Sequence, residues 1–500
     1  MRHITKVYPN GVVANDDASL SVRRGEIHAV AGENGAGKST IMKVLYGAER
    51  ADGEILINGE PVTVRSPRDA NRLGIGMVYQ HFMLVNEFTA LENIYFGIEE
   101  TGPAGVLKKE DMLKKAASLC EKYDMQLDLQ QKCADMSVST LQKVEILKVL
   151  ARGAEIIILD EPTAVLTPQE TEKLFDQLRR LRADGYTVII ITHKLKEIKA
   201  LCDRITVMRS GRTVGCYDVP EVTEEEISRL MVGRDVSLDR VPPETEPGET
   251  VLSVNNLSVK GAGEKKAVSD ISFSLRRGEI LCVAGVEGNG QKETVDAITG
   301  AISAFDGSIS FMGEDVSKLR KKKLRSLGMA HIPEDRIKTG CDIRSTIHEN
   351  LIALDFEENS TFGFVKNRLL RARSLAQTED YAVKGSLDTP LSMLSGGNMQ
   401  KVVVARELDS APVLIVADQP TRGIDVGAME TVHNRLRKMR DSGSAVLLVS
   451  ADLSEVLSLA DRILVFHEGT ITAEITDIAG TDELQLGRYM LGLDRKERAE

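Results

Sequence analysis

Short runs of apolar residues alternate along the chain with helical segments, and these runs have the length of buried strands. Two of them, 156–159 and 188–191, contain only Ile, Leu and Val, as expected for strands of a parallel sheet covered on both faces. Residues 85–150 are more helical and carry many charges, which predicts an inserted helical subdomain. The pattern therefore predicts an α/β fold in which helices wrap mainly parallel sheets.

An internal repeat divides this pattern into two similar halves. Residues 23–27 (Arg-Arg-Gly-Glu-Ile) recur at 276–280, an offset of 276 − 23 = 253. Residues 203–205 (Asp-Arg-Ile) recur at 461–463, an offset of 461 − 203 = 258. The second half has therefore gained about five residues between the two matches.

The repeat sets the expected domain boundaries. A first domain over 1–238 is followed by a linker over 239–250, where proline and acidic residues predict a stiff, solvated segment, and by a second domain over 251–500. The second domain opens with a clear strand at 251–254, whereas Met1 stands where the first domain should have its counterpart. Either this half lacks an edge strand, or its true start lies upstream of Met1, which we favour.

The composition narrows the classes of partner and compartment. The chain has 500 residues, more than one core usually organises, and a formal net charge of −11. A phosphate backbone demands a basic face, so we expect no nucleic-acid partner. Six cysteines without a Cys-x-x-Cys pair are typical of reduced cytosolic thiols. Without a signal peptide or an apolar run near roughly 18 residues, we expect a soluble chain that reaches a membrane only through a partner.

The clearest chemical motif lies between a strand and a helix at residues 26–40. Gly32, four further residues and Gly37-Lys38-Ser39 have the phosphate-loop spacing. Glycines let backbone N–H groups turn toward phosphate oxygens, and the following helix presents its positive end to them. Lys38 can reach the β- and γ-phosphates, and the Ser39 hydroxyl can ligate Mg²⁺. The residues predicted to bind nucleotide here are Gly32, Glu33, Asn34, Gly35, Ala36, Gly37, Lys38, Ser39 and Thr40.

Further candidate residues stand at the ends of predicted strands. Asp160 and Glu161 follow the first apolar run, at the carboxyl end where parallel sheets bind ligands. Asp160 is predicted to hold Mg²⁺ through water, and Glu161 to polarise the attacking water. Gln80 ends an earlier strand, where its carboxamide can touch both Mg²⁺ and a water, and His193 is predicted to contact the γ-phosphate. Tyr8 is either an adenine-stacking residue, which we favour, or a half-buried surface tyrosine.

In this order the motifs resemble those of the ATP-binding cassette (ABC) transporter family, which has a phosphate loop, glutamine, signature, acidic strand and histidine. The resemblance covers essentially the whole chain, twice. It implies two P-loop NTPase-type ABC cassettes, each with a mainly parallel sheet core and an inserted helical subdomain. It also implies ATP and Mg²⁺ as ligands, and a head-to-tail pairing in which the Ser-Gly-Gly signature of one cassette caps the ATP of the other.

The two halves depart from the family pattern in complementary ways. At the signature position, residues 136–140 read Met-Ser-Val-Ser-Thr, without the two glycines, whereas 394–398 read Leu-Ser-Gly-Gly-Asn. The second half also has Ile-Pro-Glu-Asp-Arg at 332–336, where the glutamine should stand, and no aromatic residue that matches Tyr8. Its lysine, Mg²⁺-hydroxyl, glutamate and histidine positions carry Gln291, Lys292, Gln419 and Ala451.

The asymmetry itself favours an exchange of signatures between the halves. If each half closed its own site, both sites would be defective. If the halves exchange signatures, one site collects every intact part: Tyr8, Lys38, Ser39, Gln80, Asp160, Glu161 and His193, capped by Ser395, Gly396 and Gly397. We therefore predict one site that hydrolyses ATP, closed by glycines that let backbone approach the γ-phosphate, and one degenerate site.

Two fused cassettes without membrane spans, the second degenerate, resemble the ATPase subunits of bacterial importers for simple sugars and nucleosides. Segments 80–85, 288–291 and 333–336 favour the nucleoside branch that is associated with basic membrane proteins. The resemblance implies a peripheral subunit at the cytoplasmic face of the cell membrane. Its implied partners are integral-membrane permease subunits and, indirectly, an extracytoplasmic substrate-binding lipoprotein. An importer of ribose- or galactose-like sugars stays the alternative.

Other classes of function also stay open. Soluble tandem-cassette ATPases act on ribosomes or DNA, but they usually have two intact sites and a long, often basic segment between the cassettes. A regulatory nucleotide switch without hydrolysis is another alternative. Near Gln80, the apolar residues Phe82, Met83, Leu84 and Phe88 are either a permease contact or internal core of the helical subdomain.

Overall fold

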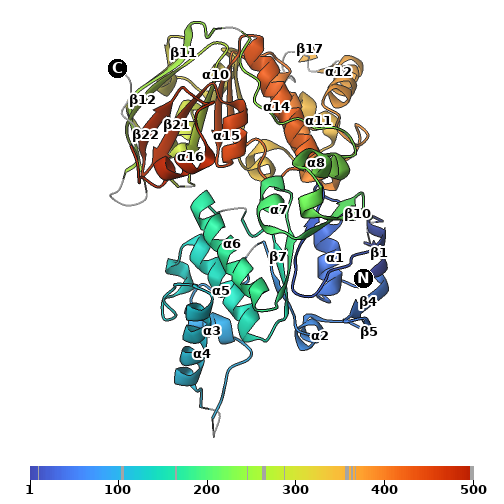
Figure 1. The fold of residues 1–500 in the computed structure, drawn as a ribbon. Helices are drawn as coiled ribbons and strands as arrows, with labels where there is room; N and C mark the ends of the chain where they lie inside the picture. Colours follow the sequence, from blue (N-terminus) through green and yellow to red (C-terminus); the bar gives the residue numbers. More distant parts are fainter. Residues whose placement is uncertain are drawn as a thin grey trace. The chain divides into compact units, whose positions relative to one another are not determined.

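The chain folds into two compact units, Met1–Val236 and Ser237–Glu500 (Figure 1). Each unit combines a four-stranded antiparallel sheet with a six-stranded, mainly parallel sheet, which confirms the α/β fold expected from the apolar runs. The computed structural model describes residues 1–9, 11–80, 82–102, 106–163, 166–244, 246–261, 266–286, 288–354, 360–361, 364–365 and 367–495.

The main sheet of the first unit is parallel except at one edge. The strands of this unit are β1 (Arg2–Val7), β2 (Val13–Ala18), β3 (Ile27–Ala31), β4 (Asp52–Ile57), β5 (Glu60–Val62), β6 (Ile75–Val78), β7 (Ile156–Asp160), β8 (Thr187–Ile191), β9 (Arg204–Arg209) and β10 (Arg212–Asp218). The main sheet has the order β10-β9-β3-β8-β7-β6, in which β10 runs antiparallel to β9. The smaller sheet has the order β2-β1-β4-β5.

The buried strands are those that the apolar runs predicted. Every residue of β3 and β8 is buried, and β7 is buried from Ile157 to Asp160. Helix α1 (Lys38–Leu45) contributes Ile41 and Met42 to the same core cluster. Because parallel strands point the same way, the residues that follow β6, β7 and β8 meet at one edge of the sheet.

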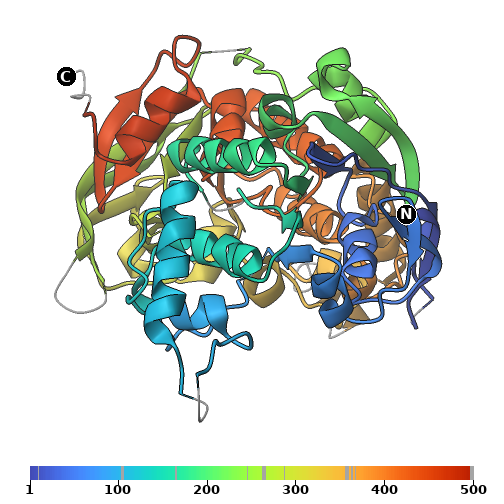
Figure 2. The same cartoon turned by 60° about the horizontal axis from the view of Figure 1, so that its bottom comes forward.

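The helical subdomain expected within 85–150 is present. Figures 1 and 2 show its helices α3 and α4 at one end of the unit and the small antiparallel sheet at the other. Capping boxes at Thr89 and Thr167 fix where two of the helices begin. Besides α1, the helices are α2 (Pro67–Arg72), α3 (Ala90–Tyr95), α4 (Lys109–Lys122), η2 (Cys133–Asp135), α5 (Val138–Ala151), α6 (Pro168–Ala183), α7 (Leu195–Leu201), η3 (Val219–Glu221) and α8 (Glu224–Val232).

The second unit repeats this plan. Its strands are β11 (Thr250–Lys260), β12 (Lys266–Arg276), β13 (Ile280–Gly285), β14 (Asp306–Phe311), β15 (Glu314–Asp315), β16 (Met329–Ile332), β17 (Ser360–Thr361), β18 (Phe364–Val365), β19 (Leu414–Asp418), β20 (Ala445–Ser450), β21 (Arg462–His467) and β22 (Thr470–Ile475). The main sheet has the order β16-β19-β20-β13-β21-β22, the same as β6-β7-β8-β3-β9-β10. Equivalent positions in the two halves can therefore be read from the sheets.

Helices cover one face of the second main sheet, and the four-stranded sheet with α9 and α10 covers the other. Alternate residues of β13 belong to two separate core clusters, with Cys282 in one and Val283 in the other. The helices are α9 (Gln291–Ile298), η4 (Val316–Lys318), α10 (Lys321–Ser326), the π-helix η5 (Arg336–Gly340), α11 (Ile347–Ile352), α12 (Asn367–Asp380), η6 (Leu391–Met393), α13 (Gly396–Leu408), α14 (Val426–Asp441), α15 (Leu453–Leu459) and α16 (Glu483–Met490).

The first unit has the strand that the sequence left in doubt, although this strand lies inside the small sheet and not at its edge. β1 pairs with β2 and β4, with Ile4 opposite Ala18 and Thr5 opposite Asp52. The alternative in which this half lacks the strand, which we did not favour, is therefore wrong, although β1 has six residues and β11 has eleven. Ile4 is the one buried residue of β1, so the sequence of this strand has no apolar pattern that would predict a strand.

The linker expected over 239–250 stays a prediction. Its first residues are hydrogen-bonded to α14, because Arg437 donates to the Asp239 carbonyl and Arg440 to the carbonyls of Val241 and Pro242. Among the described residues, none of the helices combines the length and apolar character needed to cross a membrane.

Candidate functional site

The phosphate loop of the first half joins β3 to α1, as the motif predicted. Gly37 precedes the helix with a φ of 93°, a left-handed conformation that suits glycine. A Cβ atom on Gly37 would lie 2.4 Å from the Ala14 carbonyl oxygen, and one on Gly32 would lie 2.2 Å from that of Met208. Both glycines are therefore fixed by the fold, whether or not a phosphate is bound.

Lys38 lies at the centre of this loop. Its Nζ donates to the carbonyl oxygens of Gly32 at 2.7 Å and Glu33 at 2.9 Å. On the other side, Asn15 is fully buried and its Nδ2 donates to the Gly37 carbonyl at 3.1 Å. Sequence reasoning missed Asn15, because nothing in its local pattern points to a loop 22 residues away.

Tyr8 lies beside the start of α1. Its hydroxyl is 3.5 Å from Thr40 Oγ1, and the ring is half-buried with the Lys6 ammonium 5.0 Å from the ring centroid. This placement brings an aromatic face to the phosphate loop. Its contact with adenine stays a prediction.

Three predicted catalytic residues from separate segments meet at Glu161. His193 Nδ1 lies 2.9 Å from Oε1 of Glu161, and Gln80 Nε2 donates to Oε2 at 3.0 Å. One position earlier, Asp160 Oδ1 accepts a hydrogen bond from Ser39 Oγ at 3.4 Å. The residues predicted from strand ends and from the phosphate loop are thus gathered in one place.

The pKa values of the two neighbouring carboxyl groups shift in opposite directions. Burial and the charge of Glu161 raise the pKa of Asp160. Burial also acts to raise the pKa of Glu161, but the hydrogen bond from His193 and the positive charges of His193 and Lys38 bring it below its ordinary value. Glu161 is therefore ionised at neutral pH, with each oxygen already holding a donor.

The backbone at Glu161 is unusual. Its φ is 46°, in the left-handed region that non-glycine residues rarely adopt, and Gln419 at the equivalent position has a φ of 48°. The same bend therefore follows β7 and β19, although only the first half has an acid there. Because both halves have this unusual φ, the fold itself holds the backbone in the left-handed conformation at this position, with either side chain.

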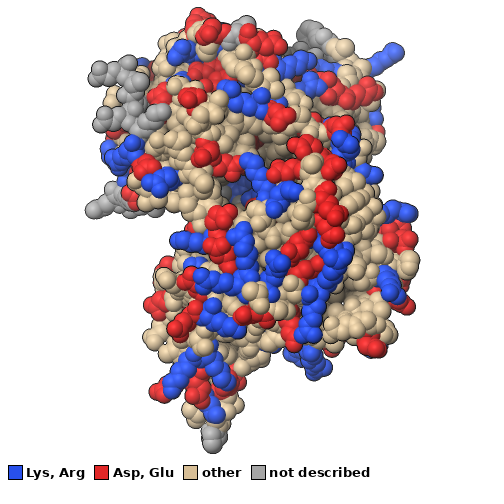
Figure 3. Space-filling view, viewed as in Figure 1, with Lys and Arg blue, Asp and Glu red and all other residues tan. Residues whose placement is uncertain are grey.

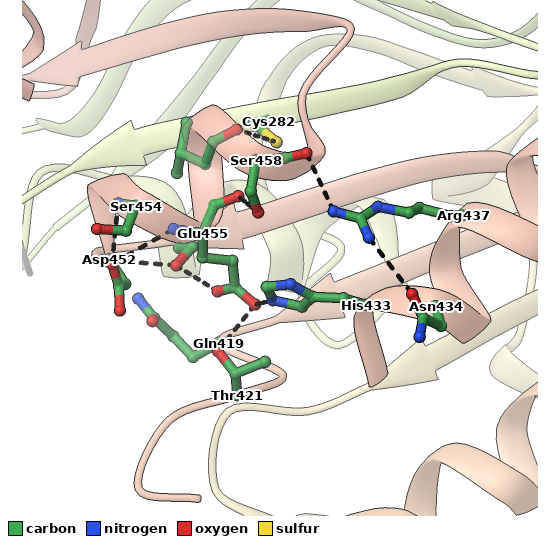
Figure 4. Close-up of polar contacts among 12 residues, drawn as sticks. Cys282, Gln419, Thr421, His433, Asn434, Arg437, Asp452, Ser454, Glu455 and Ser458 are labelled. Atoms are coloured by element: carbon green, nitrogen blue, oxygen red, sulfur yellow. Dashed lines mark hydrogen bonds and ion pairs between the residues drawn. The ribbon is translucent and has the colours of Figure 1, made fainter. Parts of the chain in front are cut away.

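A glutamate, partly buried in the first half and fully buried in the second, accepts hydrogen bonds at this edge of each sheet. In the first, Glu197 accepts hydrogen bonds from Thr163 at 2.5 Å and from Thr192, beside His193, at 3.3 Å. In the second, Glu455 accepts from Thr421 at 2.8 Å and Ser450 at 2.6 Å, and His433 also contacts it (Figure 4). Sequence reasoning missed both glutamates, because their partners come from different strands.

The phosphate loop of the second half is closed by its own glutamine. Gln291 Oε1 accepts from the Asn289 amide at 3.1 Å, and its Nε2 donates to the Val286 carbonyl at 3.1 Å. Residue 287 of this loop lies outside the described part of the chain. Lys292 is exposed at the position where the first half has the Ser39 hydroxyl, so a cation stands where a metal ligand would be required.

The acidic strand end of the second half is also changed. Gln419 Oε1 accepts from the backbone amide of Ala451 at 3.2 Å, so this side chain is used by the loop that replaces the histidine. Glu334, at the position of Gln80, forms an ion pair with Arg422. Burial and the nearby acids raise the pKa of Asp418 to about 7. These residues do not fit a Mg²⁺ ion or an attacking water.

Both signature positions begin a helix. Ser137 caps α5 by accepting from the Thr140 amide at 3.3 Å, and Ser395 caps α13 by accepting from the Asn398 amide at 3.4 Å. After the cap, Gly396 and the buried Gly397 have no side chains, whereas in the first half Val138 has a side chain and is 43% exposed. Both turns begin a helix in the same way. They differ in how closely a ligand could approach the backbone, because only the turn of the second half has glycines after the cap.

Comparisons with known proteins agree with this arrangement. A family model described as "ABC transporter" matches residues 15–164 and 268–422. The guanosine import ATP-binding protein NupO of Bacillus subtilis (strain 168) is 43% identical over 501 residues, covering 99% of this chain and 98% of that protein. The glucose import ATP-binding protein TsgD13 of Haloferax volcanii is 39% identical over 526 residues, covering 98% and 95%. The archaeal ribosome recycling factor aABCE1, solved in complex with the stalk protein aP1, has a TM-score of 0.65, 18% identity, and coverage of 95% of this chain and 90% of that one; this shows a shared fold alone.

The raised pKa of Asp418 makes the stability of the second half depend on pH. The folded form binds a proton up to about pH 7, while an unfolded aspartate loses it near pH 4, so the unfolding free energy falls as the pH rises between these values. Asp418→Asn removes this loss. We expect the difference in unfolding free energy between Asp418→Asn and the unsubstituted protein to be roughly 2 kcal/mol larger at pH 8 than at pH 5. Thermal unfolding at the two pH values measures this difference. The exposed Asp306→Asn is the control, and an equal gain for Asp418→Asn at both pH values would contradict the assignment.

Proposed function

The chain belongs to the ABC transporter family, and we propose that it is the ATP-hydrolysing subunit of an importer for nucleosides or related small solutes. The observation that carries the proposal is the convergence of His193 and Gln80 on Glu161, beside the phosphate loop of Lys38. The choice of cargo rests on the 43% identity to a guanosine import protein along nearly the whole of both chains.

In this proposal Glu161 acts on the water that attacks the γ-phosphate. Its ionised carboxylate accepts the water's hydrogen, which polarises the nucleophile. His193 and Gln80 each hold one carboxylate oxygen, so the orientation is set before ATP arrives. Lys38 supplies the charge that faces the β- and γ-phosphates, and the N-terminus of α1 adds backbone donors. Tyr8 offers its ring to the adenine.

The oxygen donors of the first half fit a Mg²⁺ ion. Ser39 Oγ and Asp160 Oδ1 are 3.4 Å apart, and burial followed by the charge of Glu161 raises the pKa of Asp160, which a bound divalent cation would lower. Gln80 adds a carboxamide oxygen from the neighbouring strand. We assign Ser39, Asp160 and Gln80 as the ligands; when bound, the metal neutralises phosphate charge during cleavage.

We further propose that the signature turn of the second half serves the ATP held by the first. A γ-phosphate needs backbone donors at close range, which the bare turn of Ser395, Gly396 and Gly397 can supply and the turn with Val138 cannot. The second half lacks a lysine at 291 and an acid at 419, so one site hydrolyses ATP and the other is degenerate.

The proposed partners are integral-membrane permease subunits and, through them, an extracytoplasmic substrate-binding lipoprotein, with this chain at the cytoplasmic face of the membrane. Met83 is 62% exposed, and Phe82, Leu84 and Phe88 are half-buried. Phe88 also packs edge-on against the exposed Phe96, with 5.8 Å between ring centroids. This exposure favours the permease contact over an internal core for these residues. His81, in the same segment, lies outside the described residues.

The remaining alternatives have less support. An importer of ribose- or galactose-like sugars would use the same ATPase parts, and a glucose import protein is only slightly less similar than the guanosine one. Action on ribosomes or DNA calls for a basic surface, whereas acidic and basic side chains are interspersed over the face drawn in Figure 3. A switch without hydrolysis would leave the placement of Glu161 unexplained.

Glu161→Gln tests the assigned base. We expect ATP turnover by the complex with its permease to fall by at least about 100-fold, because an amide cannot accept the proton of the attacking water. Gln419→Ala, at the equivalent position of the second half, should leave turnover within about twofold. Phosphate release from MgATP measures both variants. The opposite ranking would contradict a single hydrolysing site in the first half.

Ser395→Ala and Ser137→Ala form a matched pair that tests the signature assignment. Each substitution removes the cap of one helix, at a cost of about 1 kcal/mol, so both should lower the unfolding midpoint similarly. Only Ser395→Ala is expected to lower the ATPase rate of the complex, by about tenfold, because only the turn that begins at Ser395 is assigned to the γ-phosphate. Equal losses of activity would show that capping alone explains the effect.

The cargo is tested with the complete importer in lipid vesicles. Guanosine, presented with the extracytoplasmic binding protein, is expected to stimulate both ATP hydrolysis and its own uptake several-fold. Ribose and glucose at the same concentrations should do neither. Stimulation by a sugar and not by guanosine would replace the nucleoside assignment with the sugar alternative, while the ATPase assignment would be unaffected.

A further inference from the structure

The Pro333–Arg336 segment has no role in the chemistry described above. It follows β16, where the first half places Gln80 after β6. Gln80 reaches the catalytic glutamate, but Glu334 at the same position pairs with Arg422, in the loop after β19. The acid is therefore committed to an arginine within the second half. Residue 164, the counterpart of Arg422, lies outside the described part of the first half.

Arg336, two residues further on, contacts the signature turn. Its Nη1 donates to the carbonyl of Arg422 at 2.8 Å. A Cβ atom on Gly396 would lie 2.7 Å from Arg336 Nη2, and one on Gly423 would lie 3.7 Å from it. The guanidinium thus fills the space between the start of α13 and the loop after β19. The equivalent residue of the first half is Phe82, which cannot form this hydrogen bond.

Arg336 is not a loose surface side chain. The Asp335 carboxylate accepts from the amides of Ile337 and Lys338, which fixes the start of η5. The other end of η5 is tied to α13, because Arg406 donates to the Gly340 carbonyl at 2.8 Å. Nε of Arg336 is enclosed without a hydrogen-bond partner, so the position of this side chain is set by packing as well as by its bond to Arg422.

We propose that Arg336, Glu334 and Arg422 form a clamp that holds the turn of residues 395–397 in the position from which it serves ATP. Arg336 is then a positioning residue, acting through Gly396. This inference rests on the proposed function, in which that turn contacts the γ-phosphate. The Glu334–Arg422 pair is partly exposed and adds little to global stability, so its effect is on local geometry. A shift of the turn by about 1 Å is enough to slow catalysis strongly.

Arg336→Ala tests the clamp in the full chain assembled with its permease. We expect kcat for ATP to fall about tenfold while the KM for ATP changes less than about twofold, because the first half alone holds the nucleotide before closure. Arg344→Ala, an exposed arginine in the same region, is the matched control and should leave both unchanged. Glu334→Arg and Arg422→Glu should each lower kcat, and the double variant should recover most of it.

Hydrogen exchange supplies a readout that does not depend on catalysis. In Arg336→Ala, the backbone amides of residues 395–401 should exchange at least about threefold faster, with the unfolding midpoint changed by less than about 2 °C. Unchanged exchange in this segment would overturn the clamp, whatever happens to kcat. If exchange quickens but Ser395→Ala leaves the ATPase rate intact, the clamp stands and the assignment of the turn to ATP fails. The two ideas can therefore be rejected separately.

Discussion

Two neighbouring carboxylates at the end of a buried strand are the constraint on which the first half depends. Burial and the charge of Glu161 raise the pKa of Asp160, while the hydrogen bond from His193 and the charge of Lys38 hold the pKa of Glu161 down. A buried charge without partners costs several kcal/mol, so the acid pair requires cations and donors around it. The phosphate-loop lysine, the histidine and the Ser39 hydroxyl meet this requirement. The residues that we propose to be catalytic are therefore coupled to one another through their charges.

The second half shows what remains when that unit is removed. Glutamines at 291 and 419 replace a positive and a negative charge together, which avoids leaving either one buried and unpaired. The backbone nevertheless keeps the left-handed bend at Gln419, and Glu455 braces the strand ends as Glu197 does in the first half. The two sheets also have the same strand order. The scaffold and the chemistry of a cassette are thus separable, because the scaffold is held by core packing and buried hydrogen bonds that do not involve the catalytic groups.

Much of this could be predicted from the sequence, for identifiable reasons. A run such as 156–159 specifies a buried strand by composition alone, and the spacing of Gly32, Gly37 and Lys38 specifies a loop with its ligand. These signals are local. β1 was missed because only Ile4 in it is buried, and pairing with β4 rather than its own pattern makes it a strand. Asn15, Glu197 and the pairing of Glu334 with Arg422 were missed because each partner is distant in sequence. Tertiary contacts of this kind leave no trace in a single chain.

The glycines of the second signature turn illustrate how two demands can fall on one position. A Cβ atom on Gly397 would lie 2.9 Å from Asp425 Oδ2, and one on Gly396 would meet Arg336. Both residues are therefore small for packing reasons within the second half itself, before any phosphate is considered. In the first half, Val138 at the position of Gly396 has a largely exposed side chain and no arginine at its equivalent contact. A half without catalytic groups can thus still require a complete fold, because the turn depends on α13, η5 and the loop after β19 together. Because the second pocket has no proposed metal site, Glu334 is not needed as a metal ligand, and its ion pair with Arg422 can support the turn instead.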